Sequence, residues 1–443
     1  MRPLDLGSPD LTRSLLRTGL PAMGGLALNA AHQSVDGAFL GHLGTEALAA
    51  VSLALPLAGV TAALGVGLGV GTATAIARRL GAGQPDEAGR IASAAMALCL
   101  CLSVVAALAL MLGRGVLLDL LGASGAVRAP AEAYLLLMAI SAGLGIVQIL
   151  CDFVAIGEGN ARFSLITLAL CFGLNIALDP LFIFGFGWGV SGAAAATILS
   201  QVITLGLYAW YFATRRGQVR MRPHLNWRDL GPVLRVGAPE TATVLATTAA
   251  ALLLYRLAAE INGIEGLAAL GIVLRLVTLA SLPIEGFCLG AQAVLAHAAG
   301  AGDTGRLTQA ARRLAVLSCA AASLAMVLVL AAPDLARILF AASPTTAALA
   351  EPALRLMALA LPLIALRSVA QVTLQATERA RTAALLGLAP SGWLLLPLLA
   401  IFTPTLGFHG LAVSLFLAAC LAGVGAAFIL WRLPHSHPTG VTA

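Results

Sequence analysis

The sequence predicts an all-α integral membrane protein with twelve membrane-spanning helices in two six-helix lobes. Of its 443 residues, 60% are hydrophobic and only 10% are charged, and the mean hydropathy is +0.95. Soluble domains carry about 25% charged residues, so this composition excludes a soluble fold. Apolar runs of about 18 residues or more recur from end to end, and each is long enough to cross a bilayer as a helix. The two halves of the chain also resemble each other.

Apolar runs lie between charged or turn-rich breaks, and we expect each run to be one span. Their expected limits are residues 15–39, 48–76, 91–113, 131–156, 163–185, 190–212, 234–258, 266–297, 311–331, 353–375, 382–402 and 408–431. The second run contains the alternating glycines Gly65, Gly67, Gly69 and Gly71. Small residues let neighbouring helices approach closely, so these glycines predict tight packing and not a phosphate-binding loop.

The arginines set the expected orientation, because cytoplasmic loops carry an excess of positive charge. All 26 basic residues are arginines, and 19 of them fall in inner segments if the N-terminus is cytoplasmic. The others lie at outer ends or within spans: Arg114, Arg128, Arg256, Arg275, Arg337, Arg355 and Arg367. We therefore expect a multi-pass protein of the cytoplasmic (inner) membrane with both termini in the cytoplasm. The first run is too long for the core of a signal peptide and is expected to remain as a span.

An internal repeat predicts the domain organisation. Residues 48–83 align without gaps to residues 267–302, at a constant shift of 219. This predicts an N-terminal lobe over 1–214, a basic cytoplasmic linker over 215–235 and a C-terminal lobe over 236–443. Six spans per repeat give the lobes the same orientation, so the axis relating them should run along the membrane normal. Repeats of this kind are typical of transporters, whose binding sites lie between the lobes near the midplane.

The first span carries a polar stripe. Asn29, His32, Gln33 and Asp36 follow the 3–4 residue spacing of one helix face. A carboxylate at the bilayer centre costs roughly 2.5–3.5 kcal/mol, so it persists mainly where it lines a cavity or has a partner. Asp36 therefore predicts a functional site, and the alternative is a structural carboxylate near the outer interface. His32 is either a proton relay beside Asp36 or a packed histidine.

The fifth and sixth spans add complementary groups. Asn175 and Asp179 are four residues apart on one face, and Pro180 should bend the helix. Thr197 follows in the sixth span, although a lone threonine there often bonds only to its own helix. Two carboxylates and two neutral oxygens suit a proton or a hard cation such as Na⁺. Two acids in one low-dielectric pocket also favour proton binding by one of them.

Other polar residues are weaker candidates. Gln148 and Asp152 form a patch in the fourth span, and Glu285 in the eighth is either a substrate contact or a helix-end residue. Glu240 lies early in the seventh span. In the second half the repeat places Leu254 or Tyr255 opposite Asp36, so we expect the ionisable chemistry to be concentrated in the N-terminal lobe.

Several function classes are disfavoured. The seven cysteines lie scattered in apolar segments without a CxxC pair, so they predict buried packing and no redox or metal chemistry beyond a Na⁺ ion. No HExxH, GxSxG or Walker motif occurs, which argues against an enzyme and an ATP-driven pump. The net charge is +6, but the arginines form no basic face with stacking aromatics, so we expect no nucleic-acid partner.

The chain resembles the multidrug and toxic compound extrusion (MATE) family, closer to its prokaryotic DinF-type branch. The resemblance rests on "VDGAFLGHLGTEALAAVS" in the first span, on "GEGNARF" and "LNIALDPLFIFGFGWGVSGAAAAT" across the fourth to sixth spans, and on the "GAG" loops after the second and eighth. It implies a V-shaped cavity that alternates its opening, and efflux of amphipathic, often cationic compounds in exchange for protons or sodium ions. It also implies that the cation site consists of Asp36, Asn175, Asp179 and Thr197.

Our leading hypothesis is a monomeric, ion-coupled multidrug antiporter, with H⁺ or Na⁺ as coupling ion and no other cofactor. The alternative is a flippase for lipid-linked or polysaccharide substrates of the same superfamily, which often adds spans or a strongly cationic cavity. A channel or a membrane-embedded enzyme is less favoured, because neither explains acids gathered in one lobe of a two-lobe repeat.

Overall fold

The computed structural model describes residues 4–43, 51, 55–120, 128–221, 226–332 and 343–432. Within these ranges the chain consists of helices and short connections, without a strand. The chain divides into two compact units, Met1–Leu6 with Gly24–Thr241 and Gly7–Met23 with Ala242–Ala443. Helices α1 (Leu11–His42) and α8 (Trp227–Gly300) therefore each contribute to both units.

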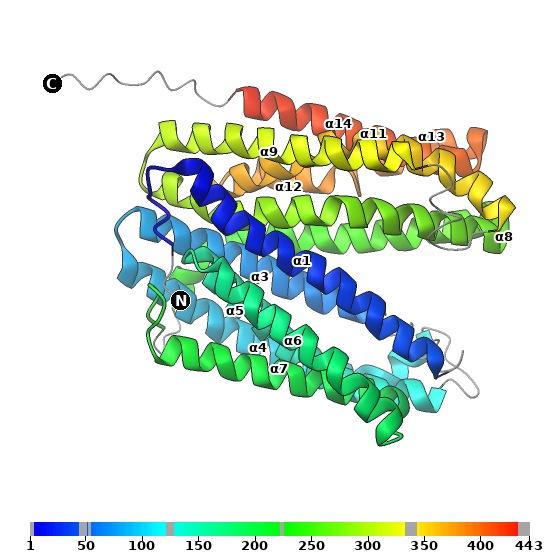
Figure 1. Ribbon diagram of the computed structural model, residues 1–443, viewed down its shortest axis with the longest axis horizontal. Coiled ribbons are helices and arrows are strands. Elements are labelled where there is room, and N and C mark those ends of the chain that lie inside the picture. The colour runs from blue at the N-terminus through cyan, green and yellow to red at the C-terminus, as the bar shows by residue number, and fades with distance from the viewer. Residues whose placement is uncertain are drawn as a thin grey trace. The chain divides into compact units, whose positions relative to one another are not determined.

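The first unit is built around one central helix. Besides parts of α1 and α8, it contains α3 (Leu55–Gly81), α4 (Pro85–Leu120), α5 (Arg128–Gly157), α6 (Ala161–Pro180), the π-helical turn η2 (Leu181–Gly185) and α7 (Gly189–Ala213), labelled in Figure 1. Helix α5 packs against α3, α4 and α7, and α6 packs against α7. Ile146, Leu150 and Val154 follow each other at four-residue intervals and bury one apolar face of α5.

The alternating glycines of α3 serve two different neighbours. A Cβ atom at Gly65 would lie 2.9 Å from Ile149 of α5, and one at Gly69 would collide with Phe153 of the same helix. Gly67 and Gly71 instead face the first turns of α8, where a Cβ at Gly71 would collide with the carbonyl oxygen of Val233. The packing predicted from this motif is therefore present on two sides of the helix.

The second unit contains the remaining helices. They are the rest of α1 and α8, α9 (Thr304–Ala331), α11 (Pro344–Ala376), α12 (Ala380–Leu388), α13 (Leu395–Leu406) and α14 (Phe408–Trp431). Helix α11 is central, because it packs against α9, α12 and α14. Side chains cap two helix starts: Asp303 accepts a hydrogen bond from the backbone N–H of Arg306, and Ser343 accepts one from Thr346.

Two breaks divide the long helical stretches. In α8, Asn262 leaves helical geometry and Gly263 has a φ of 59°, a conformation that favours glycine, so the expected seventh and eighth spans are two limbs of one element. The expected eleventh span is interrupted at residues 389–394, which form a turn between α12 and α13. Pro390 in that turn lacks the N–H group that would continue the helical hydrogen bonds.

The described helices follow the order of the expected spans: α8 covers the seventh and eighth, and α12 with α13 covers the eleventh. Nine of the described helices, α1 not among them, are long and apolar enough to cross a membrane. The start of the expected second span, at 48–50 and 52–54, lies outside the described residues. Arg222 of the linker and Arg337 also lie outside them. The all-α class predicted from the composition is confirmed for the described chain.

Candidate functional site

Helix α6 presents a polar face to the interior of the first unit. Its buried side chains recur at intervals of three or four residues, and all but Ala161 carry a polar or thiol group: Ser164, Thr167, Cys171, Asn175 and Asp179. The residues between them are mainly apolar, so the helix has a polar side toward the protein interior and an apolar side suited to lipid. At Pro180 the α-helix ends and continues as the π-helical turn η2, where the sequence predicted a bend.

Asn175 lies at the centre of the predicted site and contacts three of its members. Its amide nitrogen donates to His32 Nε2 of α1 at 2.5 Å and to Asp179 Oδ2 at 3.1 Å. Its amide oxygen accepts from the backbone N–H and the hydroxyl of Thr197 in α7, both at 3.2 Å. In this arrangement His32 Nε2 is the acceptor of the amide hydrogen bond. One buried amide thus connects α1, α6 and α7.

The two predicted carboxylates interact with each other. Asp179 is fully buried, whereas Asp36 is partly buried on α1. Asp36 lies within electrostatic range of His32 and Asp179, and Tyr134 of α5 lies within electrostatic range of both acids. The structure therefore brings Asp36, Asn175, Asp179 and Thr197 into one cluster, to which it adds the phenol of Tyr134.

The polar stripe of the first span divides between two environments. His32 points toward α6, where its ring also stacks on Phe172 with the ring centroids 4.6 Å apart. Asn29 and Gln33 are exposed, and the Gln33 amide donates to the Asn29 oxygen at 2.6 Å. Half of the stripe therefore joins the cluster, and the other half forms a hydrogen bond within α1.

Asp152 belongs to a second polar network in the same unit. It is buried and accepts hydrogen bonds from the Tyr208 hydroxyl of α7 and from Ser164 of α6, the latter at 3.1 Å. Thr167 lies 2.8 Å from the Tyr208 hydroxyl. Gln148, four residues before Asp152, instead accepts from the Cys171 thiol at 3.8 Å. These contacts tie α5, α6 and α7 together.

Glu158, in the turn after α5, is a buried carboxylate outside the predicted site. It accepts hydrogen bonds from the Tyr211 hydroxyl at 2.5 Å and from the backbone N–H groups of Gln218 and Val219 at 2.8 and 3.1 Å. Burial raises the pKa of Glu158 to about 6, against the opposing effect of these hydrogen bonds. Its one sequence signal is the flanking pair of glycines, of which Gly159 has a φ of 90°.

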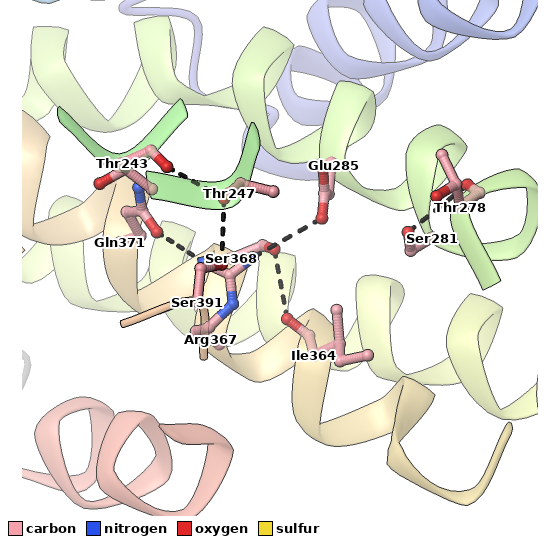
Figure 2. A network of polar contacts seen from close by, with 10 residues as sticks. All are labelled: Thr243, Thr247, Thr278, Ser281, Glu285, Ile364, Arg367, Ser368, Gln371 and Ser391. Carbon is pink, nitrogen blue, oxygen red and sulfur yellow. Dashed lines mark hydrogen bonds and ion pairs between the residues drawn. The ribbon is translucent and has the colours of Figure 1, made fainter. Parts of the chain in front are cut away.

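The remaining acid candidates lie on α8. Glu285 belongs to the second unit and pairs with Arg367 of α11 at 3.6 Å (Figure 2). Glu240 is partly buried near the start of the helix. The second unit therefore also holds an ion pair. The alignment of the two halves did not predict this pair, because Glu285 and Arg367 lie at unrelated positions of the repeat.

Comparisons with known proteins agree with this architecture. The MatE family model matches residues 21–181 and 239–401, one match in each half. The chain is 26% identical over 428 residues to the multidrug export protein MepA of Staphylococcus aureus (strain N315), covering 95% of this chain and 94% of the relative. It is similarly 26% identical over 427 residues to MepA of Staphylococcus saprophyticus, with the same coverage.

Solved structures give the same assignment. A multidrug resistance MATE family transporter of the MOP superfamily, in an outward-facing conformation, has a TM-score of 0.92 at 27% identity over 98% of both chains. A MOP superfamily transporter from Pyrococcus furiosus, described as having a binding pocket of reverse polarity, has a TM-score of 0.91 at 26% identity over 97% of both chains. The expected fold class is confirmed, and this all-helical, multi-pass membrane protein belongs to the MatE family.

Proposed function

We propose that this protein is a secondary active efflux transporter that exchanges protons for amphipathic, often cationic compounds by alternating access. The carrying observation is the cluster of Asp36, Asn175, Asp179 and Thr197, in which Asp36 interacts electrostatically with Asp179 and a buried amide joins Asp179 to Thr197. Further support comes from relatives named as multidrug export proteins. Sodium is the alternative coupling ion, because the same oxygens suit a hard monovalent cation.

The cluster couples ion binding to helix position through Asn175. A negative charge at Asp179 favours the amide orientation in which the nitrogen faces that acid and His32. Once a proton neutralises Asp179, the acid can donate a hydrogen bond, and the amide loses its preference for that orientation. The bond to His32 then weakens, and α1 is released from α6. Substrate leaves as α1 shifts, and proton release restores the first arrangement.

The distribution of the arginines supports an orientation of the protein in the membrane. We propose that both termini face the cytoplasm, since this places 19 of the 26 arginines in cytoplasmic segments. The protein then lies in the cytoplasmic membrane as a monomer and binds no nucleic acid. Protons enter the cluster from the outer side, down the gradient that the cell maintains.

The test is ethidium transport in proteoliposomes, with a pH gradient or a sodium gradient imposed one at a time. We expect the pH gradient alone to drive transport in the wild-type protein, and Asp36→Asn and Asp179→Asn to abolish it. Glu260→Gln is the control, because Glu260 is an exposed carboxylate of α8 paired with Arg256. Transport that persists in both aspartate variants refutes the proposed site, and transport driven only by sodium identifies Na⁺ as the coupling ion.

A further inference from the structure

The second unit contains a charged cluster that the cation site does not use. Arg367 of α11 forms an ion pair with Glu285 of α8, its Nη2 lying 3.6 Å from Oε1. Nη1 of the same guanidinium donates to Gln371 Oε1 at 2.8 Å. Figure 2 shows Arg367 between the two acceptors, with the hydroxyls of Thr247 and Ser391 on the same side.

Both charges lie deep within their helices. Arg367 precedes the end of α11 at Ala376 by nine residues, or about 14 Å of helix, and Glu285 precedes the end of α8 at Gly300 by fifteen residues, or about 22 Å. The Arg367 side chain is 15% exposed and the Glu285 side chain 36% exposed. A carboxylate exposed to this extent inside a span does not face hydrocarbon, because charges in spans face a bundle interior or a water-filled cavity. The exposed part of Glu285 therefore faces water.

The ion pair is longer than a strong charge-assisted hydrogen bond. Strong N⁺–H···O⁻ hydrogen bonds measure about 2.7–2.9 Å, and arginine often binds a carboxylate through two parallel ones. Here a single contact of 3.6 Å joins Arg367 to Glu285. A guanidinium has five N–H donors, of which the contacts described for Arg367 use two nitrogens. A second carboxylate can thus bind Arg367 without displacing Gln371.

Other polar and apolar groups of the same unit are also exposed. Exposed Thr247 donates to the backbone oxygen of Thr243 at 2.9 Å, and its hydroxyl lies 3.0 Å from that of Ser391. The turn after α12 also exposes an apolar surface, since Leu385 and Trp393 are 61% and 53% exposed. The Trp393 indole is held by a hydrogen bond to the Leu385 carbonyl at 2.8 Å. Hydroxyls, an ion pair and an aromatic ring therefore occur in one unit.

We propose that Glu285, Arg367 and Gln371 form a substrate-binding site for zwitterionic amphipathic compounds, with the carboxylate of the ligand on Arg367 and its ammonium group on Glu285. The pair has no net charge. A ligand that is only anionic meets the repulsion of Glu285, and one that is only cationic meets that of Arg367. A ligand with both charges satisfies both groups and leaves the site neutral, which matters most at low dielectric. The role as a substrate site rests on the proposed transport function, but binding itself is measurable without transport.

The test uses three ligands with one scaffold and different charges. Nε-dansyl-lysine is zwitterionic, its methyl ester is cationic, and its Nα-acetyl derivative is anionic. We expect purified wild-type protein to bind the zwitterion about tenfold more tightly than either derivative, as measured by dansyl fluorescence titration. Each single substitution should weaken zwitterion binding about 10- to 100-fold, the loss of one charge-assisted contact. Arg367→Gln should then favour the ester, and Glu285→Gln the acetylated derivative.

Two further variants distinguish a role of the ion pair in binding from a role in the structure. In the double variant Glu285→Arg/Arg367→Glu the pair remains neutral, so the preference for the zwitterion should persist. Arg256→Gln is the matched control, because Arg256 forms an exposed i,i+4 pair with Glu260 on the same helix. Equal affinities for the three ligands, or an order that the single variants leave unchanged, overturns the proposal. Should Arg367→Gln fail to fold, Glu285→Gln and the double variant decide the outcome.

The two proposals fail separately. If the wild-type protein prefers the zwitterion but a pH gradient drives no ethidium transport, the binding site is supported and the proposed transport function is refuted. If ethidium transport is intact and the three ligands bind equally, only the zwitterion site is refuted.

Discussion

Asn175 is the residue on which the candidate site depends, because its buried amide joins side chains of three helices. His32 has a double role beside it, since its ring accepts from the amide and stacks on Phe172. The sequence left open whether this histidine is a relay or a packed residue. The geometry shows a packed histidine, because the ring stacks on Phe172 with its acceptor nitrogen toward the amide, and the relay role stays a prediction.

Replacing His32 tests this contact. In His32→Ala the amide of Asn175 loses an acceptor while it stays buried, and such a loss costs about 1–3 kcal/mol. We expect pH-driven ethidium transport to fall about tenfold or more. His32→Gln supplies an amide oxygen in place of Nε2 and should keep a larger part of the activity than the alanine variant. Wild-type transport by His32→Ala would show that the contact is dispensable.

Glu158 yields a prediction about pH and stability. Its pKa in the folded protein is about 6, above its usual value near 4.5. The folded state therefore binds the proton more tightly than the unfolded state, so this group's contribution to stability is complete below pH 4.5 and is lost as the pH rises through 6. The difference corresponds to about 2 kcal/mol. The melting temperature in detergent should fall between pH 4.5 and 6.5 more steeply in the wild-type protein than in Glu158→Gln. Parallel curves for the two proteins would contradict the assignment.

At the scale of the helices, close packing depends on particular glycines. Gly71 of α3 leaves no room for a Cβ beside the backbone of α8, so Gly71→Ala forces the two helices apart. Overpacking of this kind costs about 1–3 kcal/mol and should lower the melting temperature by several degrees. The control is Gly206→Ala on α7, where a Cβ meets nothing within 4 Å and alanine improves helix propensity. The helix contact is refuted if both variants melt at the same temperature.

The sequence alone predicts some features of the helices and not others. Hydropathy predicts the number and order of the spans, because each must bury its backbone hydrogen bonds in lipid. It does not predict the turn at residues 389–394, because the apolar runs on both sides merge into one span, although Pro390, Ser391 and Gly392 are residue types typical of a turn. Helical periodicity places Asn29 and Asp36 on one stripe, but only the packing of α1 on α6 turns His32 inward and leaves Gln33 exposed.

For the molecule as a whole, the charged groups within the spans follow no repeat. The sequence predicts Asp36, Asn175, Asp179 and Thr197 as one site through local spacing and family resemblance. It could not predict that Tyr134 joins them, or that Glu285 meets Arg367, because these contacts connect helices far apart in the chain. The second unit therefore carries an ion pair between two residues that the sequence named separately, Glu285 as a candidate and Arg367 as a charge outside the inner segments.

The central claim is that substrate and proton compete through Asp36 and Asp179, and proton release on substrate binding tests it most directly. Tetraphenylphosphonium is a suitable probe because it is an amphipathic cation without a titratable group. It is added to purified protein in weakly buffered solution with a pH indicator, and Glu260→Gln serves as the control. We expect proton release from the wild-type protein and the control, and none from Asp36→Asn/Asp179→Asn. Equal release by the double variant, or binding to the wild-type protein without release, would contradict the mechanism.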